Sequence, residues 1–129
     1  GSALGGHAQI GERCILSGNS AVHQFTRVGR LTMVAGGSMV TRDAPPFSMV
    51  TGAHPNRWRG ANRIGLQRAG FKSDERDAIR KALRAIFAPG AAAREIAQSL
   101  SSSEFPAVRE LADFVLTSPR GVCAGLNQR

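Results

Sequence analysis

Aromatic residues are scarce in this sequence: there is no tyrosine, one tryptophan and an aromatic share of only 5%. Modules that read single-stranded nucleic acid stack bases on aromatic side chains, so this scarcity argues against that class. Cysteine is equally scarce. Cys14 and Cys123 lie far apart without paired spacing, which indicates neither a disulfide framework nor a zinc site. A reducing, cytoplasmic location is therefore expected.

Long apolar runs are also missing. No stretch of about 18 apolar residues occurs, so no membrane span is expected, and the N-terminus lacks the basic and apolar regions of a signal peptide. A length of 129 residues suits one domain, or one built from two unlike halves. Because Gly1-Ser2 replaces an initiator methionine, we expect the natural chain to begin earlier.

Acidic residues are few: nine stand against 17 basic residues, a net charge of +8. Such an excess predicts anionic partners, whether nucleotides, phosphorylated substrates, acidic proteins or nucleic acid. Residues 44–72 contain no acidic residue at all. Their basic residues are Arg57, Arg59, Arg63, Arg68 and Lys72. Sequence-specific nucleic-acid binding is the weaker alternative, since only the isoelectric point of about 11.4 supports it.

A ladder of aliphatic residues with a period of six occupies the first third of the chain. Its members are Leu4, Ile10, Leu16, Val22, Val28, Val34 and Val40. A small-residue series runs two positions before the later members: Ala8, Cys14, Ser20, Thr26, Thr32 and Ser38. Helices repeat every 3.6 residues and strands every two, so neither explains the pattern. It predicts short strands joined by tight corners, three to a triangular coil, with the aliphatic residues inside. The alternative is a chance alternation in a β-sandwich.

Glycine follows three of the aliphatic positions, at Gly5, Gly11 and Gly29. We expect these glycines to relieve backbone strain beside the corners. Residues 1–46 hold about two coils, fewer than the three units that a repeat stack usually needs. A partner surface or further N-terminal coils are therefore expected to complete the stack. The ladder ends at Asp43-Ala44-Pro45-Pro46, where proline removes hydrogen-bond donors.

Helical patterns occupy residues 73–129, after the basic connector of residues 47–72. Ser73 is expected to cap a first helix, which Pro89-Gly90 ends. A second helix is expected over about residues 91–100, and a third after Phe105-Pro106. The predicted fold class is therefore β + α: a short left-handed parallel β-helix of hexapeptide repeats, followed by a C-terminal α-helical bundle.

The polar residues best suited to catalysis or ligand binding are the histidines His7, His23 and His54. His7 and His23 lie 16 residues apart, close to one coil, so they should project from neighbouring coils about one strand spacing apart. His23 and Gln24 replace the small residue that often follows the aliphatic position. The two histidines either form a site or are surface residues bonded to neighbouring coils. No metal site is expected, since no cysteine or carboxylate lies at ligand spacing.

Five blocks of sequence share a family resemblance. They are Gly6-His7, residues 21–25 (Ala-Val-His-Gln-Phe), residues 43–47 (Asp-Ala-Pro-Pro-Phe), residues 52–55 (Gly-Ala-His-Pro) and residues 60–71 (Gly-Ala-Asn-Arg-Ile-Gly-Leu-Gln-Arg-Ala-Gly-Phe). Together they resemble the C-terminal half of acyl-[acyl-carrier-protein]:UDP-N-acetylglucosamine O-acyltransferases, from about Leu4 to near Val122. That family begins lipid A synthesis.

The resemblance implies a homotrimer with active sites in the clefts between neighbouring β-helices. There, without a cofactor, a 3-hydroxyacyl chain passes from acyl carrier protein to the 3-hydroxyl of UDP-N-acetylglucosamine. In the family a histidine acts as general base, which suits imidazole because it titrates near neutral pH. That histidine belongs to a pair upstream of the one that Gly6-His7 matches. The resemblance therefore implies that the base is absent from this chain and that the chain alone is inactive.

The same resemblance assigns supporting roles to residues that are present. Gly6 matches a glycine whose backbone N–H stabilises the thioester oxyanion. His7 and Gln24 match residues placed against the sugar, and His23 matches a further active-site histidine.

Asn62 and Arg68 match residues that hold the nucleotide, where the planar donors of arginine suit a diphosphate. Some family members carry Glu where this chain has Ile64 and Arg where it has Ala69. The alternative for Asn62 and Arg68 is a helix cap and a solvated charge. An Arg-rich surface would also steer the acidic carrier protein towards the site. The alternative for the whole chain is a non-catalytic module that trimerises and caps a hexapeptide-repeat protein.

Overall fold

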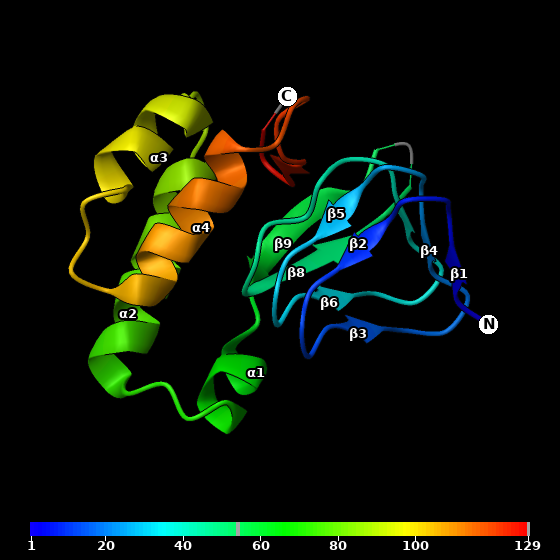
Figure 1. The fold of residues 1–129 in the computed structure, drawn as a ribbon, viewed down its shortest axis with the longest axis horizontal. Helices are drawn as coiled ribbons and strands as arrows, with labels where there is room; N and C mark the ends of the chain where they lie inside the picture. The colour runs from blue at the N-terminus through cyan, green and yellow to red at the C-terminus, as the bar shows by residue number, and fades with distance from the viewer. Residues whose placement is uncertain (54, 129) are drawn as a thin grey trace.

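The computed structural model describes residues 1–53 and 55–128; His54 and Arg129 lie outside the described residues. Short strands fill the N-terminal half and helices the C-terminal half, and the two parts pack side by side (Figure 1). The strands are β1 (Ala3–Leu4), β2 (Gln9–Ile10), β3 (Ile15–Leu16), β4 (Ala21–Val22), β5 (Arg27–Val28), β6 (Met33–Val34), β7 (Met39–Val40), β8 (Ser48–Thr51), β9 (Arg57–Ala61) and β10 (Ala124–Gly125). The helices are α1 (Arg63–Arg68), α2 (Ser73–Ile86), α3 (Ala93–Leu100) and α4 (Pro106–Leu116).

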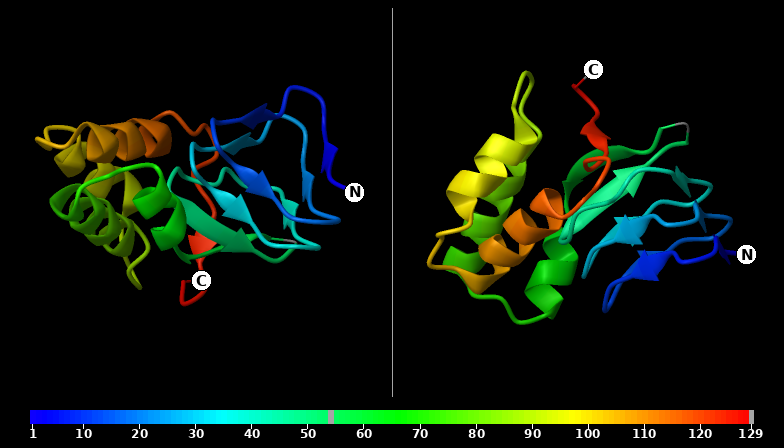
Figure 2. Two further views of the ribbon diagram at one scale, coloured as in Figure 1. Left: turned by 90° about the horizontal axis from the view of Figure 1, so that it is seen from below. Right: turned by 45° about the horizontal axis from the view of Figure 1, so that its top comes forward.

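The short strands are wound into coils that stack on one another (Figure 2). Strands pair in parallel in the orders β1-β4-β7, β2-β5 and β3-β6-β8. Ala3 lies opposite Ala21, and Ile15 lies opposite Met33, an offset of 18 residues in both cases. The pairing therefore has the period that three hexads predict.

The ladder residues form the interior of these coils. Val22, Val28, Val34 and Val40 are all buried, and the small residues between them, such as Thr26, are buried with them. Leu4 at the first coil is 56% exposed. The first coil lacks a neighbour on its outer side in the structure, which leaves its interior residue uncovered.

The glycines of the ladder have a different role from the one expected. A Cβ atom on Gly5 would lie 2.5 Å from the backbone nitrogen of Gln24, and one on Gly29 would lie 2.3 Å from that of Pro46. Positive φ angles occur instead at non-glycine corner residues, among them His7 (57°) and Phe25 (60°). Glycine is thus required because successive coils approach closely, and the strained torsion angles lie at other residues.

The coil sheet extends beyond residue 46, where the sequence predicted its end. Strand β8 pairs in parallel with β6, β9 folds back antiparallel to β8, and β10 from the C-terminus pairs with β9. The prolines form a corner instead of an exit, because the hydroxyl of Thr32 donates to the carbonyl oxygen of Pro45 at 2.7 Å. The segment 47–72 therefore contains a hairpin and α1, neither of which the sequence indicated.

Helices α2, α3 and α4 pack around buried aliphatic residues such as Leu83 and Leu111. Helix α2 is capped by Lys72, whose backbone N–H donates to the Glu75 carboxylate at 3.1 Å, so the prediction that Ser73 is the cap was wrong by one residue. The stacked rings of Trp58 and Phe87, 4.4 Å apart, join β9 to the helices. Across residues 1–53 and 55–128, no helix combines the length and apolarity that crossing a membrane requires.

Candidate functional site

The histidines and their neighbours gather at one corner of the coils. His23 takes the place of Gly5 one coil later, because both backbone nitrogens donate to the ladder residue of the next coil, at 2.8 Å in each case. The residue opposite His7 is Phe25, and the two rings stack at 4.9 Å. His7 and His23 therefore lie in the same region of neighbouring coils, as expected. They are not directly opposite each other, however, because their separation of 16 residues is two short of a coil.

Three adjoining cavities surround this corner. Gly6, His23 and Gln24 line one of about 340 Å³. His23 and Gln24 also line a cavity of about 300 Å³ with Asp43. His7 lines a third, of about 450 Å³, which Asp43 and Phe25 border as well. The four residues predicted for the catalytic and sugar side thus lie together, although no single cavity contains all of them.

Backbone and side-chain contacts hold this corner firmly. The buried hydroxyl of Thr26 donates to the carbonyl oxygen of Gln24 at 3.4 Å. The backbone N–H of Arg27 donates to the buried carboxylate of Asp43 at 2.9 Å, and its Nε lies 3.6 Å from the other carboxylate oxygen. By contrast, the side chains of His23 and Gln24 make no hydrogen bond with any described residue and are exposed. Rigid backbone with free polar side chains suits ligand binding.

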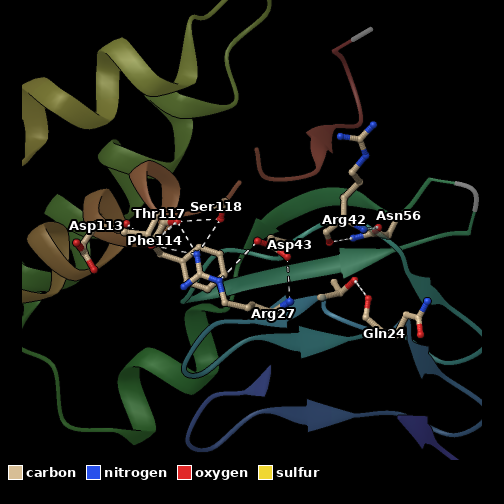
Figure 3. Close-up of polar contacts among 10 residues, drawn as sticks. Gln24, Arg27, Arg42, Asp43, Asn56, Asp113, Phe114, Thr117 and Ser118 are labelled. Carbon is tan, nitrogen blue, oxygen red and sulfur yellow. Dashed lines mark hydrogen bonds and ion pairs between the residues drawn. The ribbon is translucent and has the colours of Figure 1, made fainter. Parts of the chain in front are cut away.

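Arg27 also ties the corner to the helices, as Figure 3 shows. Its Nη2 donates to the carbonyl oxygen of Phe114 at 3.0 Å, the hydroxyl of Thr117 at 3.1 Å and that of Ser118 at 3.0 Å. Its guanidinium lies 4.1 Å from the centre of the Phe114 ring. The sequence did not single out these residues, because partners 87–91 positions apart leave no local signal.

Gly6 presents an unoccupied backbone donor. Its N–H makes no hydrogen bond within residues 1–53 and 55–128, whereas its carbonyl oxygen accepts from Phe25 N at 3.0 Å. The space beside its Cα is open, since a Cβ atom there would meet nothing within 4 Å. The equivalent N–H of Gln24 is also free among the described residues. Availability alone therefore does not single out Gly6.

Asn62 and Arg68 lie elsewhere, on the short helix α1. Asn62 is buried and caps this helix: its Oδ1 accepts from Gly65 N at 3.1 Å, and its Nδ2 donates to the carbonyl oxygen of Leu31 at 2.8 Å. This is the structural role that the sequence left open for Asn62. Arg68 is exposed and forms no ion pair with any residue in the described part of the chain.

A cavity of about 800 Å³ opens beside Asn62 and Arg68. Its lining is mostly apolar and includes two further arginines, Arg13 and Arg63. The apolar lining includes Ile15, Leu31, Met33, Met49, Ile64 and Ala69. A cavity lined by both aliphatic residues and arginines suits a ligand with an aliphatic part and a phosphate.

The two groups of predicted residues do not meet within one chain. The 800 Å³ cavity shares no lining residue with the three cavities around His7, His23 and Gln24. One chain therefore presents two partial sites.

The titratable groups with perturbed pKa values lie mainly away from these cavities. Burial raises the pKa of the Cys123 thiol to about 12, and burial also raises that of Cys14. The hydrogen-bonded Glu110 carboxylate raises the pKa of Arg30 and anchors it to α4. Among residues 1–53 and 55–128, no group of three His, Cys, Asp or Glu side chains could hold a metal ion.

Comparison with known proteins finds relatives that share this sequence and fold. The family model described as "Udp N-acetylglucosamine O-acyltransferase; Domain 2" matches residues 43–123. An acyl-[acyl-carrier-protein]--UDP-N-acetylglucosamine O-acyltransferase of Gloeothece citriformis is 40% identical over 129 residues, covering 95% of this chain and 46% of the relative. Its counterpart in Synechocystis is 46% identical over 85 residues, covering 66% of this chain and 30% of that protein.

Solved structures agree. The UDP-N-acetylglucosamine acyltransferase of Francisella novicida superposes with a TM-score of 0.89 at 33% identity, covering 98% of this chain and 47% of that one. The Campylobacter jejuni enzyme gives 0.87 at 30% identity, covering 95% and 50%. This chain thus spans about half the length of the relatives it matches. Since the family model covers more than half of the chain, the chain belongs to the UDP-N-acetylglucosamine O-acyltransferase family.

Proposed function

We propose that this chain is the C-terminal part of an acyltransferase that moves a 3-hydroxyacyl group from acyl carrier protein to the 3-hydroxyl of UDP-N-acetylglucosamine, the first step of lipid A synthesis. The observation that carries the proposal is the presence of two partial sites, each built from residues of the family motifs. His7, His23 and Gln24 form the sugar side, with Gly6 donating to the oxyanion. Asn62 and Arg68 form the nucleotide side.

The active site forms between neighbouring chains of a homotrimer, where the sugar side of one chain faces the nucleotide side of the next. The separation of the two sides within one chain supports this arrangement, because neither side alone surrounds a nucleotide sugar. The apolar lining of the cavity that Arg68 borders is available to an aliphatic chain. Exposed aliphatic residues on the coils, such as Ile15 (51% exposed), gain cover from a neighbour.

The general-base histidine belongs to a coil upstream of Gly6, so this chain alone is inactive. The exposed Leu4 supports further coils on that side. In this proposal residues 1–46 form coils at the end of a left-handed hexapeptide β-helix, and β8 continues their sheet beyond residue 46. Residues 47–72 connect it to the helical cap of residues 73–129. The role of Gly6 rests on its place in the motif and on its free N–H.

The carrier protein approaches along the basic surface in the cytoplasm. The net charge of +8 supports this, because a basic surface attracts an acidic protein over the distance at which salt does not yet screen the charges. Arg59 and Arg63 are exposed and without a carboxylate partner in the described part of the chain. Long-range attraction raises the association rate more than the affinity.

A transfer assay with 3-hydroxyacyl carrier protein and UDP-N-acetylglucosamine tests the proposal. We expect turnover by the longer protein that includes the upstream coils and none by this chain alone. Turnover by this chain would contradict the upstream base. Absence of turnover by the longer protein would contradict the function itself and would favour the non-catalytic trimerising and capping module. Light scattering on the purified chain tests the trimer, which a monomer would contradict.

A further inference from the structure

The loop that follows α4, residues 117–121, lies over the corner that carries His23 and Gln24. Hydrogen bonds from the coils reach three of its residues. Arg27 donates to the side chains of Thr117 and Ser118, and Arg42 Nη1 donates to the carbonyl oxygen of Arg120 at 3.0 Å. Ser118 is fully buried, and its carbonyl oxygen accepts from Gly121 N at 3.0 Å. The coil stack therefore anchors the loop at Thr117, Ser118 and Arg120.

This loop contributes one cationic residue to the sugar-side cavity. Arg120 lines the cavity of about 300 Å³ together with His23, Gln24 and Asp43. Its guanidinium makes no hydrogen bond or ion pair with residues 1–53 or 55–128, although its backbone is anchored. Arg120 is exposed, and its guanidinium has no partner among the described residues, so it is available to a ligand.

The charge balance of the cavity favours an anion. Asp43 is the carboxylate of this cavity, and Arg27 already neutralises it through Nε at 3.6 Å and its backbone N–H at 2.9 Å. Arg42, which anchors the loop, has no carboxylate within ion-pair distance among the described residues. Among the described residues, no carboxylate pairs with Arg120, which lines the same cavity.

We propose that Arg120 is a phosphate-binding residue of the sugar-side cavity, and that Arg27 and Arg42 position it. The inference rests on the proposed function and adds a residue from the C-terminal loop to that site. The fork of donors on a guanidinium matches a phosphate, while imidazole and amide groups beside it suit hydroxyls. Two sources carry this chemistry: the diphosphate of a nucleotide sugar, and the phosphate that links a carrier protein to its acyl-bearing arm.

Steady-state kinetics of the longer protein separates the two sources. We expect Arg120→Ala to raise the KM of one substrate about tenfold or more, the factor that a hydrogen bond to a charged group contributes. Because this phosphate lies away from the reacting bond, kcat should stay unchanged. A rise in the KM of UDP-N-acetylglucosamine identifies the diphosphate, and a rise in that of the acyl carrier protein identifies the carrier arm. Arg120→Lys keeps the charge but loses the planar set of donors, so its KM should lie between that of the unmodified protein and that of Arg120→Ala.

The matched control is Arg84→Ala, which removes the same charge from an exposed site on α2 without a hydrogen bond or ion pair to any described residue. Unchanged KM values for both substrates in Arg120→Ala, or an equal rise in Arg84→Ala, would overturn the proposal. So would a loss confined to kcat. If the longer protein shows no turnover, titration of this chain with inorganic pyrophosphate decides separately. If Arg120→Ala binds pyrophosphate more weakly than Arg84→Ala does, the phosphate site stands although the proposed function fails. If the two variants bind pyrophosphate equally, the phosphate site and the proposed function are both overturned.

Discussion

The contacts of Arg27 predict how strongly the coils and helices stabilise each other. Arg27→Ala removes the donor to the C-terminal end of α4 and the cation over the Phe114 ring. One Nη2 group has two hydrogens, so its three acceptors count as about two full hydrogen bonds. With the ring contact, we expect a loss of about 3 kcal/mol in the free energy of unfolding. Asp43 keeps its bond from the backbone N–H, which limits the loss.

Urea unfolding followed by circular dichroism measures this loss. Arg84→Ala is again the charge-matched control and should change the free energy of unfolding by less than about 0.5 kcal/mol. In a double-mutant cycle, Arg27→Ala and Phe114→Leu should be non-additive because the side chains touch. A loss below about 1 kcal/mol for Arg27→Ala would refute the reasoning, since it would mean that the hydrogen bonds from Nη2 and the ring contact give no net stabilisation over water.

Three further predictions follow from burial and close approach. Asn62→Ala should destabilise the chain by about 2 kcal/mol in urea unfolding, because the cap and the bond to the coil are both lost; an unchanged midpoint would contradict that structural role. Burial raises the pKa of Cys123 to about 12, so the unfolded chain loses this proton first as pH rises above the ordinary value of 9.0. Stability should therefore fall by about 1 kcal/mol between pH 9 and 10, and Cys123→Ala should flatten this slope; equal slopes would disprove it. Gly29→Ala should prevent folding or lower the free energy of unfolding by more than about 3 kcal/mol, because its Cβ would meet the backbone of the next coil. The control Gly6→Ala, whose Cβ would meet nothing within 4 Å, should show the same thermal melting as the unmodified chain. Similar melting of the two variants would argue against close approach as the reason for glycine.

Repetition made the coils predictable. Each hexad carries its own copy of the pattern, so the ladder from Leu4 to Val40 predicted the interior residues and the 18-residue pairing. The helix over Pro106–Leu116 was predicted for a similar reason, since apolar spacing and proline at the start are local signals. Strand β8 was missed because its offset from the strand of the preceding coil is 16 residues and not 18, with Met33 opposite Met49.

The candidate site divides along the same line. His7, His23, Gln24, Asn62 and Arg68 could be named from short motifs, because each motif is contiguous in the chain. The sequence could not show that Asn62 and Arg68 lie apart from the histidines. Nor could it show that the side-chain amide of Asn62 is hydrogen-bonded to the backbones of Leu31 and Gly65. Those facts depend on which coil corner each residue reaches.

By itself, the sequence determined the repeat, the ladder of buried aliphatic residues and the family motifs, because these are properties of neighbouring residues. Only the tertiary structure decided which glycines separate coils and which loop covers the histidine corner. Arg27 lies 91 residues from Ser118, and Arg42 lies 78 residues from Arg120. Contacts over such separations form only when the helices fold back on the coils, which is why the phosphate-binding role proposed for Arg120 could be inferred only from the folded chain.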